Sequence, residues 1–372
     1  MHYIKKLSYA VLAYTLASTS VAIADTAKPQ LIKKKTDPVA IKSYWTPERM
    51  RQATAMDLPM ADPQRIKLSF DELMQKQKGK PSDVHLGHPP VTTIAPDTHP
   101  LFEPIRSTPT VSKMDTGRLN EYFSSQALVP SNADQSYPYM AIGKLFFVDT
   151  NGNPKTCSAS VVANRLILTA GHCAHNGNGS PTGWYHNWLF VPAYHNGTAP
   201  FQSWAPLVIG VADEWYVSNN QVPNAHDYAI LMMADEVINN SVQMIGNIVG
   251  VLGYKTYSTI PNHAHLIGYP DNLDGGQLMH QVTAQSAVAV SPNNAEYGSD
   301  MSLGSGGGPW IQNFGPVSAG QTGGIHAERN MIIGLSSYGY NDAFTLAEGS
   351  PILDSTFSSD MSQMCALEPQ NC

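Results

Sequence analysis

A histidine and an aspartate in this chain stand where each could take part in proton transfer. His172 ends an apolar stretch that begins at Arg165 and turns through small residues, and Asp227 stands directly before the apolar residues 228–231. An imidazole can act as a general base, and a buried carboxylate beside it can hold the ring in one tautomer. If the fold brings the two together, they predict general-base chemistry.

The stretch from Asp300 to Trp310 is the second candidate for chemistry. Glycine occupies positions 304, 306, 307 and 308, and Pro309-Trp310 opens an apolar stretch. Glycine permits tight backbone turns, and successive amide groups in such a turn can surround an anion. We therefore expect a loop that can bind a negatively charged group and that leads into a strand.

The histidine segment resembles the general-base segment of trypsin-like serine peptidases. Residues 157–162 read Cys-Ser-Ala-Ser-Val-Val, and residues 165–173 form an apolar strand that ends in Ala-Gly-His-Cys. A lone histidine is usually structural, but the flanking cysteines and small residues make this segment specific. The resemblance implies that His172 is the base and that a disulfide between Cys157 and Cys173 joins the strand to the turn.

Asp227 resembles the aspartate that orients this base in the same family, where the sequence Asp-Ile-Ala-Leu-Leu is typical. Here Asp227 precedes Tyr-Ala-Ile-Leu at 228–231, whereas the nearby alternatives Asp213 and Glu214 precede a weaker strand. An ordinary turn aspartate is the other interpretation. The order of histidine, aspartate and glycine-rich loop along the chain favours the catalytic one.

The glycine-rich loop resembles the family's nucleophile loop, which reads Gly-Ser-Ser-Gly-Gly-Pro-Trp in secreted microbial members. When residues 307–310 are aligned with its Gly-Gly-Pro-Trp, the nucleophilic serine falls on Gly306. Three interpretations stay open: a true substitution, a shifted register with Ser305 as nucleophile, and an engineered or erroneous residue in an active enzyme. The register favours substitution, because the shift loses the match to Pro309. The amides of Gly304 and Gly306 are the expected oxyanion-hole donors.

The resemblance also assigns residues that recognise a substrate. Asp300 falls at the base of the primary specificity pocket, where an aspartate pairs with Arg or Lys. Ser337, Tyr338 and Gly339 resemble the Ser-Trp-Gly strand against which a substrate backbone pairs. Glutamyl endopeptidases are close relatives that use a histidine where Ser336 stands here. We therefore expect cleavage after Arg or Lys rather than after Glu.

The fold is expected to be all-β. From Tyr137 onward, short apolar stretches alternate with Gly, Asn and Pro turns, which is typical of a sandwich or barrel. The family resemblance implies two antiparallel six-stranded β-barrels with the site in the cleft between them. The expected strands are 140–148, 158–169, 189–192, 228–233, 264–268, 282–290, 311–314 and 331–337.

The first 120 residues have a different character. Residues 1–24 resemble a secretory signal peptide, since two lysines precede a short apolar stretch that ends in Ala-Ile-Ala. Residues 25–120 are polar and rich in proline, with one expected helix at 63–80. We predict a prosegment or linker there, before a peptidase domain at 121–372. Residues 44–50 resemble the prosegments of microbial trypsin-like proteins, and a solvated, disordered tail is the alternative.

Composition narrows the partners that the chain could have. Residues 25–120 hold 15 Lys or Arg and 11 Asp or Glu, whereas residues 121–372 hold only 5 Lys or Arg and 18 Asp or Glu. The larger part is therefore negatively charged and would repel nucleic acid. No cofactor and no metal are expected, because the chain lacks a His-Glu-x-x-His motif and the ending of a phosphate loop. No stretch is apolar for long enough to anchor the chain in a membrane.

Four cysteines in an exported chain predict disulfides, with three pairings open. Proximity favours Cys157 with Cys173 and Cys365 with Cys372.

Two functions follow from these assignments. The first is a secreted or periplasmic, monomeric serine endopeptidase that hydrolyses proteins or peptides after Arg or Lys. Its extension would be removed at a residue such as Arg106, Lys113 or Arg118, which would uncover the cleft. The second is a pseudopeptidase that binds peptides or inhibitors in the same cleft without cutting them, because Gly306 has no hydroxyl.

Overall fold

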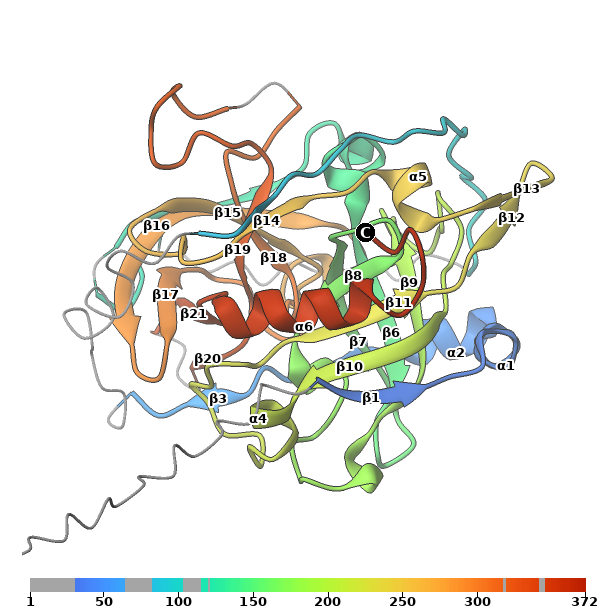
Figure 1. The fold of residues 1–372 in the computed structure, drawn as a ribbon, viewed down its shortest axis with the longest axis horizontal. Helices are drawn as coiled ribbons and strands as arrows, with labels where there is room; N and C mark the ends of the chain where they lie inside the picture. Colours follow the sequence, from blue (N-terminus) through green and yellow to red (C-terminus); the bar gives the residue numbers. More distant parts are fainter. Residues whose placement is uncertain (1–30, 64–81, 103–114, 120, 317–318, 341–344) are drawn as a thin grey trace, which may run out of the picture.

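The computed structural model describes residues 31–63, 82–102, 115–119, 121–316, 319–340 and 345–372, and two large curled sheets form its body (Figure 1). The first sheet holds β1 (Leu31–Lys35), β2 (Thr54–Ala55), β6 (Ile142–Val148), β7 (Pro154–Val161), β8 (Leu166–Thr169), β9 (His186–Pro192), β10 (Pro206–Ala212) and β11 (Ala229–Met233). Its strand order is β1-β10-β11-β8-β7-β6-β9, and β2 pairs with β7.

The second sheet contains β4 (Val84–His85), β5 (Phe123–Ala127), β14 (Gly253–Lys255), β15 (His263–Gly268), β16 (His280–Val290), β17 (Asn294–Gly298), β18 (Pro309–Gln312), β19 (Met331–Leu335) and β21 (Ala347–Pro351). Its order is β21-β17-β16-β15-β18-β19-β14-β4, and β5 pairs with β16. Two further pairs join β12 (Glu236–Ile238) to β13 (Ser241–Gln243) and β3 (Met60–Ala61) to β20 (Gly339–Tyr340).

Helices are short and lie at the margins of the sheets. The α-helices are α1 (Pro38–Tyr44), α2 (Pro47–Gln52), α4 (Asp213–Tyr216), α5 (Ile245–Val249) and α6 (Ser355–Cys365). The 3-10 helices are η1 (Ser131–Gln135), η2 (Tyr139–Ala141), η3 (Gly171–Cys173), η4 (Pro181–Gly183) and η5 (Asp274–Gly276). In the part of the chain that the structure describes, no helix has both the length and the apolar character needed to cross a bilayer.

The mainly β architecture matches the predicted fold class, with corrections to individual strands. The stretch 158–169, predicted as one strand, is divided between β7 and β8, which pair antiparallel with Ser160 opposite Leu168. The chain reverses at residues 162–165, where the amide of Val162 donates to the carbonyl of Leu166. Asn164 and Arg165 are the polar residues of this turn, and the apolar residues on either side concealed it.

Other elements have no clear signal in the sequence. β17 reads Asn-Ala-Glu-Tyr-Gly and β21 reads Ala-Glu-Gly-Ser-Pro, neither of which resembles an apolar strand. Both strands are nevertheless fully buried and pair with each other along their whole length. The expectation of six strands in each barrel also changes. Among the described residues the first sheet has eight strands, two of them (β1 and β2) from the N-terminal extension, and the second has nine, one of them (β4) from the extension.

The extension packs on the sheets wherever the structure describes it. β1 pairs antiparallel with β10 over five residues. Asp37 caps α1 and Thr46 caps α2, because their side chains accept hydrogen bonds from backbone amides of the first turn. Trp45 is 7% exposed and lies 5.6 Å from the ring of Phe146 in β6. A solvated tail is therefore wrong for these residues.

Several expectations for the N-terminal part fall outside the described residues: the leader at 1–24, nearly all of the helix expected at 63–80, and the processing positions Arg106 and Lys113. Arg118, the third expected processing position, is described. Its guanidinium lies 2.6 Å from the carboxylate of Glu296, and its side chain is 16% exposed. A processing peptidase could therefore bind Arg118 only if its ion pair with Glu296 were broken.

Trp45 provides a test of how firmly the extension belongs to the folded body. We expect Trp45→Ala to lower the free energy of unfolding by about 3 kcal/mol, because truncation of a buried aromatic side chain leaves a cavity. Urea denaturation followed by circular dichroism measures this change. Val39→Ala is the control, since Val39 is 75% exposed in the neighbouring helix. Equal midpoints for the two variants would contradict the packing described above.

Candidate active site

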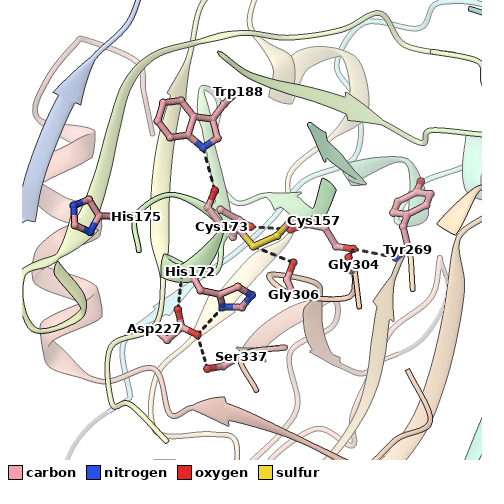
Figure 2. Close-up of a disulfide and its surroundings, with 12 residues drawn as sticks. Cys157, His172, Cys173, His175, Trp188, Asp227, Tyr269, Gly304, Gly306 and Ser337 are labelled. Atoms are coloured by element: carbon pink, nitrogen blue, oxygen red, sulfur yellow. Dashed lines mark hydrogen bonds and ion pairs between the residues drawn. A yellow bond between two sulfur atoms is a disulfide. The ribbon is translucent and has the colours of Figure 1, made fainter. Parts of the chain in front are cut away.

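The pairing of β8 with β11 brings His172 and Asp227 together. These strands are antiparallel, with Ala229 at the start of β11 opposite Thr169 at the end of β8. The residues that follow β8 and those that precede β11 therefore emerge at the same end of the sheet. Nδ1 of His172 lies 2.9 Å from Oδ2 of Asp227, and the His172 amide donates to Oδ1 at 2.8 Å (Figure 2).

Both residues of this pair are buried. His172 is 1% exposed and Asp227 is 0% exposed. Oδ2 of Asp227 also accepts a hydrogen bond of 2.6 Å from the hydroxyl of Ser337, which follows β19 of the second sheet. The carboxylate is thus satisfied by donors from both sheets. An Nδ1–H that donates to Asp227 leaves the lone pair of the imidazole on Nε2.

Nε2 of His172 faces Gly306 and has no partner. It is a buried nitrogen without a hydrogen bond within the described residues. An ideal Cβ placed on Gly306 would be in close contact with this nitrogen, and Figure 2 shows Gly306 beside the imidazole. A side chain at position 306 would therefore meet the base directly, after a shift of the ring to relieve the close contact.

The glycine-rich loop is held in place by the first sheet through Ser158. The amide of Ser158 donates to the carbonyl of Gly306 at 2.9 Å, and the hydroxyl of Ser158 donates to the carbonyl of Gly304 at 2.9 Å. Gly304 has φ +88° and Gly307 has φ +79°, values at which other residues are strained. The neighbouring Cys157–Cys173 disulfide fixes β7 to the turn that carries the histidine.

Ser305 is not brought to the imidazole. It is fully buried, and its hydroxyl donates to Oε1 of Glu348 at 2.6 Å. Glu348 also accepts from the hydroxyls of Ser299, at 3.3 Å, and Ser336, at 3.0 Å. One buried carboxylate thus joins the glycine-rich loop to two neighbouring segments of the second sheet.

Asp300 lies at a pocket near the loop. The pocket is lined mainly by residues 299–303, 339–340 and 345–347. Asp300 is 8% exposed, and its Oδ1 has no hydrogen-bond partner among the described residues. Burial raises the pKa of Asp300. A cationic group in this pocket would supply the missing partner and favour the ionised carboxylate.

The three residues expected to bind a substrate backbone have different positions. Ser337 bonds to Asp227 as described above. The ring of Tyr338 points into the second sheet, where its hydroxyl donates to Glu296 at 3.0 Å. Gly339 lies on the rim of the pocket and begins β20.

Glu348 is the residue of this site that the sequence did not reveal. It stands in a polar stretch without a motif, and its serine partners are 12 to 49 residues away along the chain. Only the pairing of β17 with β21 and the neighbouring loop brings them together.

Both disulfides predicted from proximity are present: Cys157–Cys173 and Cys365–Cys372. Ligand atoms of Cys157, His172 and Cys173 lie within 4.8 Å of one another, a spacing that could hold a metal ion. The two sulfur atoms are bonded to each other, however, so this group offers no thiolate ligands.

Comparison with known proteins gives one family and a set of similar folds. Residues 131–347 match the family model described as Trypsin. The crystal structure of protease Anisep from Arthrobacter nicotinovorans is 24% identical, with a TM-score of 0.50, and the match covers 65% of this chain and 100% of that one. At this identity it shows the shared fold alone. No curated protein matches.

Two further solved structures have lower TM-scores. The thermostable serine protease AL20 from an extremophilic microorganism is 24% identical with a TM-score of 0.48, and the match covers 62% of this chain and 98% of that one. A Glu endopeptidase in complex with MPD is 18% identical with a TM-score of 0.49, and the match covers 68% of this chain and 100% of that one.

Glu348 predicts a dependence of stability on pH. Burial raises its pKa to about 7, from an ordinary value of 4.5, and the serine donors offset only part of this rise. The folded state therefore holds the proton more tightly than the unfolded state. The stability that this provides is complete below pH 4.5 and is lost as the pH rises towards 7.

We expect Glu348→Gln to flatten the fall in the free energy of unfolding over this pH range, as measured by urea denaturation at several pH values. Glu368→Gln is the control, because Glu368 is exposed. An unchanged pH slope in Glu348→Gln would show that the carboxyl titrates normally.

Proposed function

The chain belongs to the trypsin family of serine peptidases, and on this basis we propose that it binds peptides beside His172 without cutting them. The base and the carboxylate that orients it are present in bonded geometry. The hydroxyl group that the base would deprotonate is absent, because Gly306 carries no side chain. The chain in its present sequence is then a pseudopeptidase with an intact peptide-binding cleft.

The orphaned Nε2 of His172 is the observation that carries this proposal. In acyl transfer, the base must lie within hydrogen-bond reach of the nucleophile. Here the nitrogen that would accept the proton is buried, unpartnered and directed at position 306. Ser305, the other candidate nucleophile, directs its hydroxyl to Glu348 instead. These contacts support a true substitution at 306 over a shifted register.

A second candidate function, serine endopeptidase activity, is favoured by the completeness of the surroundings. His172, Asp227 and the loop that contains Gly304 and Gly306 keep their mutual arrangement, and only a hydroxymethyl group is missing. A form of the chain with serine at position 306 would carry the nucleophile on the atom that faces the base. We therefore propose that a single substitution at position 306 would restore the missing nucleophile.

Asp300 supports a preference for basic side chains. Its unpartnered oxygen and the pocket beside it suit an arginine or lysine that enters from the cleft. The carboxylate and the cation would each satisfy the other's buried charge. The proposed ligands are accordingly peptides or protein segments with an exposed Arg or Lys.

Export is part of the proposal. Disulfides persist in oxidising compartments, and the chain has two of them within its described residues. Together with the expected leader at residues 1–24, they support a secreted or periplasmic protein. Residues 25–120 would then form a prosegment or linker before the peptidase domain.

Substitution at position 306 tests the proposal. We expect the present chain to remain unlabelled by a peptidyl diphenyl phosphonate that carries arginine, and Gly306→Ser to become labelled at the new serine, as detected by mass spectrometry. Gly306→Ala is the matched control, since it brings the same close contact with His172 but no hydroxyl. Labelling of the present chain at Ser305 would contradict the proposal.

Specificity can be tested in the same background. We expect Gly306→Ser to react with the arginine phosphonate faster than with its leucine analogue, by roughly tenfold or more, because a buried charge pair is lost with leucine. Asp300→Asn should remove this preference, whereas Asp97→Asn, at an exposed site, should retain it. Equal preference in the two double variants would exclude Asp300 as the determinant.

A further inference from the structure

We propose that residues 54–61 of the extension are a resident peptide that occupies the cleft in a register unsuited to cleavage. The site is therefore latent until this segment is displaced. This inference rests on the proposed peptide-binding function of the cleft. We call residues 54–61, Thr-Ala-Met-Asp-Leu-Pro-Met-Ala, the resident segment.

The resident segment is bonded to both sides of the cleft. At its start, β2 runs parallel to β7 and places Thr54 opposite Lys155. The amide of Met56 then donates to the carbonyl of Thr156 at 2.8 Å. At its end, β3 runs parallel to β20, and the amide of Gly339 donates to the carbonyl of Pro59 at 3.1 Å. The segment thus crosses from the first sheet to the rim of the second.

Between these two bonded ends, the resident segment contacts the glycine-rich loop. The amide of Gly304, one of the two proposed oxyanion donors, donates to the carbonyl of Met56 at 3.0 Å. A peptide from another molecule would need this same donor for the carbonyl under attack. The resident segment and an incoming peptide therefore compete for it.

Leu58 packs between the glycine-rich loop and Gly339, beside the pocket of Asp300. Its side chain is 3% exposed and lines the pocket. One of its methyl groups would lie 3.4 Å from a Cβ on Gly306, and the other 3.4 Å from a Cβ on Gly339. Leucine is too short and too apolar to pair with the carboxylate at the pocket, whose Oδ1 stays unpartnered. A longer cationic side chain would fit better.

In the register of the resident segment, the side chain at the pocket and the carbonyl at the oxyanion donor come from two different residues. Cleavage after a basic residue requires that one residue place its side chain in the pocket and its carbonyl at the oxyanion donors. Here Met56 supplies the carbonyl, and Leu58 supplies the side chain. Neither the bond after Met56 nor the bond after Leu58 is thus presented for attack.

The resident segment is covalently part of the chain, and this favours its binding over that of a free peptide. The segment follows α2 directly, and Met50 in that helix is 6% exposed. A short tether gives a segment an effective concentration in the millimolar range. A peptide in solution must outcompete that concentration, although its own contacts with the pocket could be stronger.

Hydrogen exchange of the full chain tests the occupancy. We expect slow exchange at residues 54–61 and at the amides of Gly304 and Gly339, measured by mass spectrometry of peptic fragments. Leu58→Ala should accelerate exchange at these amides by roughly tenfold, the factor that corresponds to about 1.4 kcal/mol of lost contacts. Leu86→Ala is the matched control, because Leu86 lies in the same extension and is 73% exposed.

Binding of p-aminobenzamidine, followed by its fluorescence, gives a second measurement. We expect Leu58→Ala to bind this cationic probe roughly tenfold more tightly than the unchanged chain or Leu86→Ala. Fast exchange at the three sites in the unchanged chain, or measurable and equal affinity for the probe in all three proteins, would overturn the inference. Accelerated exchange without any probe binding would support the occupancy and contradict the proposed function instead.

The register has its own test in Gly306→Ser, with the intact mass followed over time. We expect no cleavage after Met56 or Leu58, while Leu58→Ala/Gly306→Ser reacts with the arginine phosphonate faster than Gly306→Ser does. Cleavage at either bond would show that the segment binds as a substrate and would overturn the proposed register.

Discussion

The buried carboxylate of Asp227 is the constraint on which the geometry of the site depends. An ionised carboxylate without partners is costly in a protein interior, so its position is fixed by the donors that satisfy it. Two of these donors come from His172 and the third from Ser337, on the other sheet. The carboxylate that holds the imidazole therefore also joins the two sheets.

A second buried acid, Glu348, performs a comparable role under the glycine-rich loop. Three serine hydroxyls converge on it, from Ser299, Ser305 and Ser336. Its partners are neutral, so burial dominates and the pKa rises to about 7. Hydrogen bonding to Glu348 thus holds the loop in place without a contribution from a free amino terminus.

The parts of the site that could be predicted from the sequence are those encoded by local segments. His172 and Asp227 each adjoin an apolar strand, so their positions follow from motifs of a few residues, and proximity along the chain favoured both disulfides. Glu348 could not be predicted in this way, because its environment is assembled from distant segments. Burial of a polar strand such as β21 depends on its neighbours, which the periodicity of one segment does not reveal.

The extension participates in both sheets, and this determines how the protein could be switched on. β1 continues the first sheet and β4 the second, while the stretch that crosses the cleft lies between them in the chain. Loss of the whole extension would strip an edge strand from each sheet and uncover apolar residues of the body such as Phe146, on which Trp45 packs. Displacement of residues 54–61 alone would remove the short strand β2 but would leave the edge strands β1 and β4 in place. Opening of the cleft would then be a local exchange of one bound peptide for another, with the edge strands of the extension left in place.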